Sequence, residues 1–505
     1  MKKYNKTNKL IAGAFFVGLA AMSCSKFLEV APQGAITEQE ISTNPSAAQD
    51  LVTSVYNIMW QGGLHGVGFV GMTNIASDDA DKGSHPTDGA ATMGRLDDLS
   101  QWDPSITTLD QIWSGHFAAI ARANQALAYI TLSPADEIVK NRLTGEVRFL
   151  RAYFYFNLVR FFGGVPKIDE VPPLEEINNP SYQQKATKEE IYELIVGDLE
   201  FAVENLPIKG DGGTQLGRAN KGAATGMLAK VFLYQQNWQR AYELSSQLVN
   251  GQVGNYDLLA NYEDIWRHVG ANSVESLFEV QTGVNAACTA AIDNYAFSQG
   301  PRGSGPDNLG WGFGTPSESL TNAYEEGDQR REATIIFINP DGNTVLWDGY
   351  TFPGTTTTNE RYNYKSYHSR VQEPNCAAAG RLPKNLRILR FGEVLLIHAE
   401  AALATGNVAE AMEDINRLRL RAGIAPLSMA DISREAIWNE RRVELGMEHD
   451  RYFDLVRQEA IQPGRAVQAF EADGKVWVKG RHELFPIPQN QIQLSEGELA
   501  QNPGY

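Results

Sequence analysis

Apolar residues recur at three- and four-residue steps between residues 40 and about 250, and this period predicts amphipathic helices. The clearest stripes cover residues 112–130 and 147–161. The second stripe ends at Gly163-Gly164-Val165-Pro166, where glycine and then proline stop a helix. Three more helices are predicted over residues 187–205, 217–234 and 238–248. The first of them opens with the capping-box pattern Thr187-Lys188-Glu189-Glu190.

The same period returns between residues 386 and about 458, with stripes over residues 388–402, 408–418 and 433–456. The first two stripes are separated by the short turn Gly406-Asn407, so they predict a hairpin of two helices. Several such hairpins along the chain predict TPR-like stacking. The fold class is therefore mainly α, and residues 459–505 read as an extended tail punctuated by proline.

The segment from residue 255 to about 385 has no sustained period. It is rich in rings and glycine, with 12 aromatic residues and 10 glycines between Tyr295 and Tyr367. Linkers lack aromatics, so this composition predicts long loops with short strands inside one folded domain of residues 24–505. Loops of this length in a compact protein are usually functional.

The first 24 residues have the pattern of an export signal. Four lysines precede an apolar run from Leu10 to Met22, which is too short to span a bilayer of about 30 Å hydrocarbon thickness. Ala21-Met22-Ser23-Cys24 resembles a lipoprotein box. The expectation is a signal peptide over residues 1–23 and an acylated Cys24 that anchors the chain to a membrane.

Composition excludes several other classes. The chain has 505 residues, is 43% hydrophobic and carries a formal charge of −17, so a nucleic-acid surface is not expected. It has three cysteines and no Cys-x-x-Cys, which argues against structural zinc. Cys288 and Cys376 could pair outside the cytoplasm, but nothing in the sequence fixes their distance.

Acids and arginines are interspersed along residues 440–454, and such a cluster can indicate the active site of an enzyme. Most of these acids have an arginine three or four residues away, so a network that holds helices together is the favoured interpretation, with Arg148, Arg151 and Arg160 as further members. His398 lies among apolar residues and is expected to be a hydrogen-bonded core histidine. No HExxH, GxSxG, Walker A or Rossmann pattern occurs.

The chain resembles the SusD/RagB family of outer-membrane nutrient-binding lipoproteins of Bacteroidetes. The motifs that carry the resemblance occur in the family's order and reach from Cys24 to the terminal Gln501-Asn-Pro-Gly-Tyr505; the others are residues 24–34, 145–166, 389–400, 416–423, 440–457 and 486–488. The resemblance implies a helical scaffold, an irregular ligand face, capture of an oligosaccharide or in some members a peptide, and delivery to a SusC-like TonB-dependent transporter. It implies no catalysis and an outward-facing lipoprotein of the outer membrane.

In that family the ligand face draws on two segments, here residues 78–102 and the mid-chain insertion. Sugars present an apolar face and a rim of hydroxyls, so aromatic rings with nearby polar groups are the candidates. The candidate glycan-binding residues are Trp311, Tyr295, Trp347, Tyr350, Trp102, Asp78, Asp79, Arg95 and Asn308, with Asp307 and Arg302 close in sequence.

Asp78, Asp79 and Asp81 leave three roles open: acceptors for sugar hydroxyls, weak candidates for a Ca²⁺ site, or solvated and capping side chains. No other cofactor is expected. For the protein as a whole, the alternatives to glycan capture are peptide capture on the same scaffold, a glycan-degrading enzyme, and a TPR scaffold protein. The export signal argues against the last of these.

Overall fold

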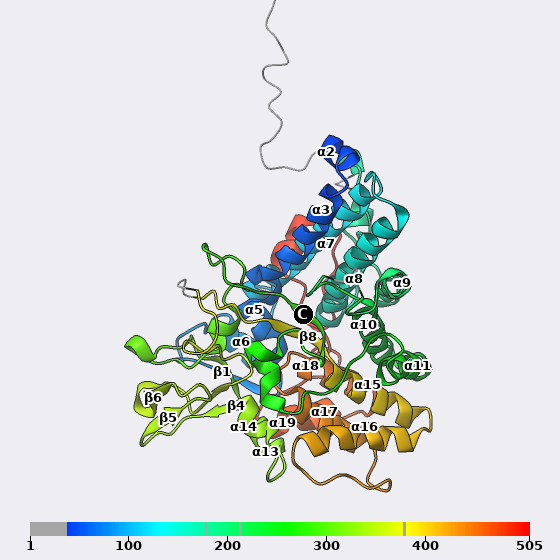
Figure 1. Cartoon of the computed structure of the whole chain (residues 1–505). Helices are drawn as coiled ribbons and strands as arrows, with labels where there is room; N and C mark the ends of the chain where they lie inside the picture. The colour runs from blue at the N-terminus through cyan, green and yellow to red at the C-terminus, as the bar shows by residue number, and fades with distance from the viewer. Residues whose placement is uncertain (1–37, 177–178, 212–214, 377–379) are drawn as a thin grey trace, which may run out of the picture.

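The computed structural model describes residues 38–176, 179–211, 215–376 and 380–505. Long helices fill one side of the molecule, and short strands gather on the other side (Figure 1). This division matches the periodic and the non-periodic segments of the sequence. The prediction of a mainly α fold with an irregular short-strand region is therefore confirmed.

The N-terminal helices surround one long antiparallel pair, α7 (Thr107–Ile130) and α8 (Glu137–Phe162). Asp136 caps α8, since its side chain accepts a hydrogen bond from the backbone N–H of Val139. Gly163 ends the helix at a positive φ of 73°, which favours glycine. Around this pair lie α2 (Glu38–Thr43), α3 (Ala47–Asn57), α4 (Gly62–His65), α5 (Val67–Val70) and α6 (Met93–Asp97).

The next helices are α9 (Lys188–Asn205), α10 (Lys221–Tyr234) and α11 (Trp238–Val249). The predicted capping box is confirmed, because Thr187 and Glu190 bond to each other's backbone N–H. The predicted start of α10 at residue 217 is wrong. Gly217 has φ of 84°, outside the helical region, and Asn220 caps the helix instead.

The hairpin predicted between residues 388 and 418 is confirmed as α15 (Phe391–Ala404) and α16 (Val408–Arg421), with Gly406 in the turn at φ of 89°. The α15 helix also packs against α10 and α11, so consecutive hairpins lie side by side (Figure 1).

The single helix predicted over residues 433–456 is wrong. The chain forms α17 (Arg434–Leu445) and α18 (Arg451–Ile461), and the break between them holds Met447 and His449 at φ of 67° and 76°. Periodicity could not reveal this break, because its cause is distant. His449 bonds to Thr73 at 2.8 Å and to Tyr295 at 2.9 Å.

The tail is not wholly extended, which corrects a second prediction. After α18, which ends at Ile461, come α19 (Arg465–Ala472) and α20 (Gln489–Leu494), separated by irregular chain. Phe485 of the tail lies fully buried and stacks on Trp102 with 4.2 Å between ring centroids. The tail therefore closes the core rather than running over it.

The irregular region contains short helices and paired short strands. Its helices are α12 (Tyr295–Gln299), α13 (Glu318–Ala323) and α14 (Arg330–Thr334). The strands form four antiparallel pairs: β1 (Ala80–Gly83) with β3 (Phe313–Pro316), β2 (Ser276–Val280) with β8 (Leu386–Arg390), β4 (Ile335–Phe337) with β7 (Arg361–Asn363), and β5 (Asn343–Val345) with β6 (Thr351–Pro353).

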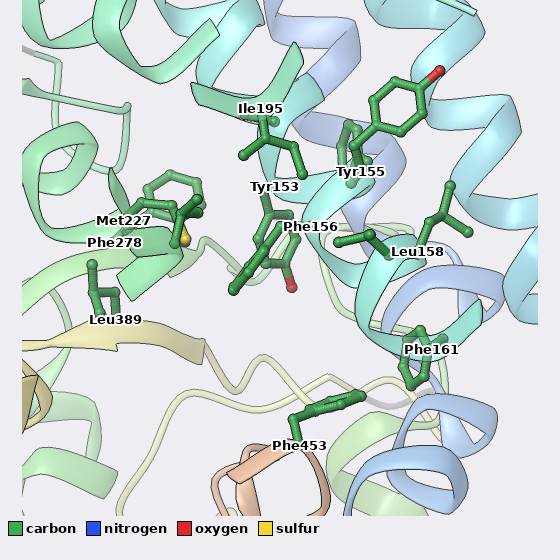
Figure 2. Packing of buried hydrophobic residues seen from close by; sticks show 14 of the residues in the cluster. Tyr153, Tyr155, Phe156, Leu158, Phe161, Ile195, Met227, Phe278, Leu389 and Phe453 are labelled. Carbon is green, nitrogen blue, oxygen red and sulfur yellow. The ribbon is translucent and has the colours of Figure 1, made fainter. Parts of the chain in front are cut away.

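One hydrophobic cluster joins the helices to the pair β2–β8. Phe156 and Phe161 of α8 lie at its centre, with Met227 of α10, Phe278 of β2 and Phe453 of α18 around them (Figure 2). The cluster includes residues from Ala48 to Leu499, so its burial ties both ends of the described chain to the same core. Within the described residues, no helix is both long and apolar enough to cross a membrane.

Candidate functional site

The two segments expected to form a ligand face are joined directly by strand pairing. Strand β1 from the first segment pairs with β3 from the mid-chain insertion, with Asp81 opposite Thr315 and Gly83 opposite Phe313. The backbone N–H of Ser84 extends the pairing by donating to the carbonyl oxygen of Gly312 at 2.6 Å. Chain segments more than 200 residues apart therefore share one surface.

An open groove of about 520 Å³ runs beside this strand pair. It lies between the β1 segment and the residues that lead into β7. Its lining residues are Asp81, Lys82, Gly83, Ser84, Pro86, Asp97, Thr315, Thr358, Asn359, Glu360 and Arg361. Hydroxyl, amide, carboxylate and guanidinium groups dominate this lining, and such groups donate and accept hydrogen bonds.

Asp81 and Lys82 of β1 are the two charged residues of this strand that line the groove. Burial raises the pKa of Asp81, and Lys475 and Arg361 oppose that shift. Burial lowers the pKa of Lys82, whose ammonium donates to the carbonyl oxygens of His85 and Asp88 at 2.9 and 3.1 Å. Within the part of the chain that the structure describes, the Asp81 carboxylate accepts no hydrogen bond. It is therefore available to a ligand.

Ion pairs fix the walls of the groove. Asp97 accepts from the backbone N–H of Lys82 at 3.1 Å and pairs with Lys475 at 3.0 Å. Arg302 of the insertion pairs with Asp88 of the first segment at 2.8 Å, and Ser84 also donates to Asp88 at 2.9 Å. These contacts lock the two segments together, so the groove is preformed.

Trp311 does not line the groove, although it directly precedes Gly312, whose carbonyl oxygen is bonded to Ser84. Its backbone N–H donates to the carbonyl oxygen of Phe297, and the two rings meet edge to face with centroids 5.9 Å apart. Both rings are half-buried, and Trp311 packs against the main core cluster. The Trp311 ring is therefore packed against its neighbours, with the Phe297 ring on one side of it.

Tyr295 and Trp102 lie in the core, which places them away from a glycan. Tyr295 is 7% exposed and its hydroxyl bonds to His449. Trp102 is 1% exposed and its indole N–H donates to the carbonyl oxygen of Leu96. The sequence could not show this burial, because the contacting residues come from the break between α17 and α18, from α18 and from the tail.

Trp347 and Tyr350 belong to the loop between β5 and β6 and pack in a separate small cluster with Leu309, Ile336 and Phe352. The guanidinium of Arg267 lies over the Trp347 ring, 4.6 Å from its centroid. The Tyr350 hydroxyl donates to Asp307 at 3.3 Å. Both rings are half-buried, and neither lines the groove.

Asp78 and Asp79 are buried and paired with arginines. Arg451 binds both oxygens of Asp78 at 2.6 Å, and Arg442 lies 2.8 Å from Asp79. Burial alone would raise the pKa of Asp78, but Arg451 and Arg442 lower it well below its usual range. These carboxylates hold α17 and α18 to the first segment, so the structure argues against a hydroxyl or Ca²⁺ role for them. Among the described residues, no group of three or more acids, histidines or cysteines is arranged to hold a metal.

The last two candidates also lie outside the groove. The Asn308 carbonyl accepts from Arg370 at 2.8 Å, and its side chain accepts from the backbone of Gly303. Arg95 pairs with Asp103 and donates to Ser105. Of the predicted acidic and aromatic residues, Asp81 is the one that lines the groove.

The acid–arginine segment, residues 440–454, is a buried network, as predicted. Its pairs mostly join different elements rather than neighbours on one helix. Arg330 contacts Glu440 and Glu444 at 2.5 and 3.0 Å, and Arg441 contacts Asp454 at 2.7 Å. Arg160 joins the network at Asp450, whereas Arg148 and Arg151 pair with Asp198 instead. His398 is a core histidine, bonded to Asp414 and Ser246.

Most of the residues that line the groove were not predicted from the sequence. Its second wall comes from residues 358–361, which begin with the last residue of the run Thr355-Thr356-Thr357-Thr358. Four hydroxyls followed by an amide and two charges are a composition suited to sugar hydroxyls. This polar run was not predicted to bind sugar, because the candidate residues were chosen mainly for their aromatic rings.

Two family models and several known proteins match this sequence, and they agree with the observed fold. A family model described as SusD family matches residues 274–505, and one described as starch-binding associating with outer membrane matches residues 26–233. A SusD-like protein of Bacteroides ovatus is 27% identical over 93% of this chain and 86% of its own length. SusD-like protein P2 of Formosa agariphila is 28% identical over the whole of both chains.

Two solved structures of SusD-like and surface glycan-binding proteins superimpose on this chain. A laminarin binding SusD-like protein superimposes with a TM-score of 0.74 at 29% identity, covering 91% of this chain and 99% of its own. Surface glycan-binding protein A from Bacteroides fluxus gives the same TM-score and coverage at 28% identity. The fold is that of SusD-like proteins. The chain belongs to the SusD/RagB family.

Proposed function

We propose that this protein is a non-catalytic glycan-binding lipoprotein of the outer membrane, which captures an oligosaccharide and delivers it to a SusC-like TonB-dependent transporter. The observation that carries the proposal is similarity along nearly the whole chain to a laminarin binding SusD-like protein. The groove between β1 and residues 358–361 is the proposed binding site.

The chemistry of the groove supports this choice of ligand. A sugar needs acceptors and donors for its hydroxyls, and Asp81, Thr315, Asn359 and Arg361 supply both kinds. The groove is open to solvent, so a long chain can lie along it without being enclosed.

The arrangement of the carboxylates in the groove favours binding without turnover. A glycosidase needs two carboxylates roughly 5–10 Å apart across its cleft, one of them able to donate a proton. Of the acids that line the groove, Asp97 is paired with Lys475 at 3.0 Å and the Glu360 side chain is 90% exposed, so Asp81 faces no second buried, unpaired carboxylate there. No cofactor is needed for the proposed role.

The membrane part of the proposal rests on Cys24 and on the family description "associating with outer membrane". Residues 1–37, which include the predicted signal peptide and Cys24, lie outside the described residues. An acylated Cys24 would tether α2 and the rest of the fold at the membrane surface, where a transporter could receive the captured ligand.

The proposal is tested by titrating the chain that starts at Ser25 with a panel of soluble glycans that includes laminarin and starch, followed by calorimetry. We expect saturable binding of at least one glycan and no change in its chain length after prolonged incubation. Shortened products would indicate the glycan-degrading enzyme. Binding of peptides but of no glycan would indicate the alternative nutrient.

A further inference from the structure

Cys288 and Cys376 lie on two loops of the irregular region that meet at one backbone carbonyl. Asn285 caps a tight turn, in which its carbonyl oxygen accepts from the backbone N–H of Cys288 at 3.0 Å. The Cys376 thiol approaches the same oxygen at 4.0 Å. Residues 88 positions apart therefore converge on a single atom.

The two thiol groups also contact each other. A hydrogen bond between the side chains of Cys376 and Cys288 raises the pKa of Cys376. The structure holds both residues as thiols, with Cys288 buried and Cys376 partly exposed.

Contacts that do not involve sulfur hold the same two segments side by side. The backbone N–H of Asn294 donates to the carbonyl oxygen of Gly380 at 3.0 Å, and Arg381 lies 3.9 Å from Asp293. The approach of the two cysteines is thus a property of the packed segments. It does not depend on the side chains of the cysteines themselves.

We propose that Cys288 and Cys376 form a disulfide in the exported protein, which covalently joins the turn at residues 285–288 to the turn at residues 369–376. The location outside the reducing cytoplasm rests on the proposed function, whereas the ability to form the bond does not.

The oxidant is a disulfide-bearing molecule such as oxidised glutathione. The more accessible Cys376 thiolate attacks one sulfur of that disulfide, forms a mixed disulfide and releases one thiol. The Cys288 thiolate then displaces the second thiol and completes the protein disulfide. Two protein thiols lose two protons and two electrons, and the oxidant leaves as two thiols.

The bond would stabilise the frame around the proposed ligand face. Asn375 closes its turn by donating to the Ser369 carbonyl at 2.9 Å, and Arg370 of the same turn donates to the Asn308 carbonyl at 2.8 Å. Asn308 leads directly to Leu309 and Trp311. A crosslink at Cys376 therefore restricts the turn that supports the loop before β3.

The test uses the full chain in detergent with Cys24→Ala, so that Cys288 and Cys376 are the remaining thiols. The folded protein is incubated with oxidised glutathione, digested without reductant and analysed by mass spectrometry. We expect a peptide that joins Cys288 to Cys376 and loss of both titratable thiols. The melting temperature should rise by about 5 °C over the reduced protein, because closing a long loop restricts the unfolded chain.

The variants Cys288→Ala and Cys376→Ala are the controls. Each should melt as the reduced protein does, whatever the redox buffer, and a cooperative melting transition verifies that each variant is folded. Two unreacted thiols in the folded, glutathione-treated protein would overturn the proposal, as would a disulfide that forms after denaturation alone. None of these readouts involves a glycan, so failure here is distinct from failure of the proposed function.

Discussion

The guanidinium of Arg451 binds both carboxylate oxygens of Asp78 at 2.6 Å, although the two residues are 373 positions apart. Asp78 is fully buried and Arg451 is 7% exposed. Two parallel bonds of this kind are directional, so the pair fixes the start of β1 against the first turn of α18. The groove beside β1 therefore depends on a residue of the C-terminal helices.

We expect Arg451→Ala to destabilise the protein by about 3–5 kcal/mol, because it leaves the buried Asp78 carboxylate without its main partner. The measurement is the free energy of unfolding in denaturant. Arg331→Ala is the matched control: Arg331 pairs with Glu332 on the surface, where an ion pair contributes about 0–1 kcal/mol. If both variants unfold at the same denaturant concentration as wild type, the Arg451–Asp78 pair does not hold β1 in place.

Stability should fall as the solution is acidified below pH 6.5, because buried histidines stay neutral in the fold. His65 is bonded to Met59 and Tyr153, and burial lowers its pKa to about 4. The unfolded chain binds the proton at about pH 6.5 and the folded chain does not, so stability is present above pH 6.5 and is lost toward pH 4.

Replacing His65 should therefore flatten the pH profile. Between pH 7 and pH 5, we expect the loss of unfolding free energy in His65→Gln to be about 2 kcal/mol smaller than in wild type, although the variant is less stable at pH 7. His85→Gln changes an exposed histidine and should keep the wild-type slope. Equal slopes in wild type and His65→Gln would mean that this histidine is not held neutral.

Trp311→Ala should lower stability, because the ring packs against Phe297 and the main core cluster. Removing the ring exposes Phe297, breaks an edge-to-face pair and leaves a gap against the core, a combined loss of about 2–3 kcal/mol. Thermal melting measures this, and Trp311→Phe should recover most of the loss. A wild-type melting temperature for Trp311→Ala would show that the ring has no packing role and would return it to the list of ligand platforms.

Cys24→Ala should release the protein from the membrane without unfolding it, because the proposed anchor is the acyl chains and not the fold. Cell fractionation without the transporter partner measures this, and a melting curve of the released protein verifies the fold. Retention of Cys24→Ala in the outer-membrane pellet at wild-type levels would contradict the anchor assignment.

Local rules predicted the helices well, because a helix is specified by its own residues. The capping box at Thr187 and the glycine stop at Gly163 are short-range signals, and both occur where the sequence places them. The break between α17 and α18 was missed because its cause, the contact of His449 with Thr73 and Tyr295, involves residues more than 150 positions away.

The site was harder to predict for the same reason. Asp78 and Tyr295 have the composition of ligand-binding residues, but their availability depends on Arg451 and His449, which no local pattern connects to them. The family resemblance correctly indicated that residues 78–102 and the insertion share a surface, since β1 pairs with β3. It could not indicate that the polar run at residues 358–361 forms the opposite wall.

The claim that a glycan binds in the groove is tested most directly by titrating Asp81→Asn with a glycan that wild type binds. Asp81 lines the groove, and its carboxylate is available to a sugar hydroxyl. A charged hydrogen bond contributes about 1.5–3 kcal/mol, so we predict that affinity falls at least about 10-fold while the melting temperature stays near that of wild type. Asp341→Asn, an exposed change outside the groove, should bind as wild type does. Unchanged affinity in Asp81→Asn would contradict the account and place the glycan elsewhere.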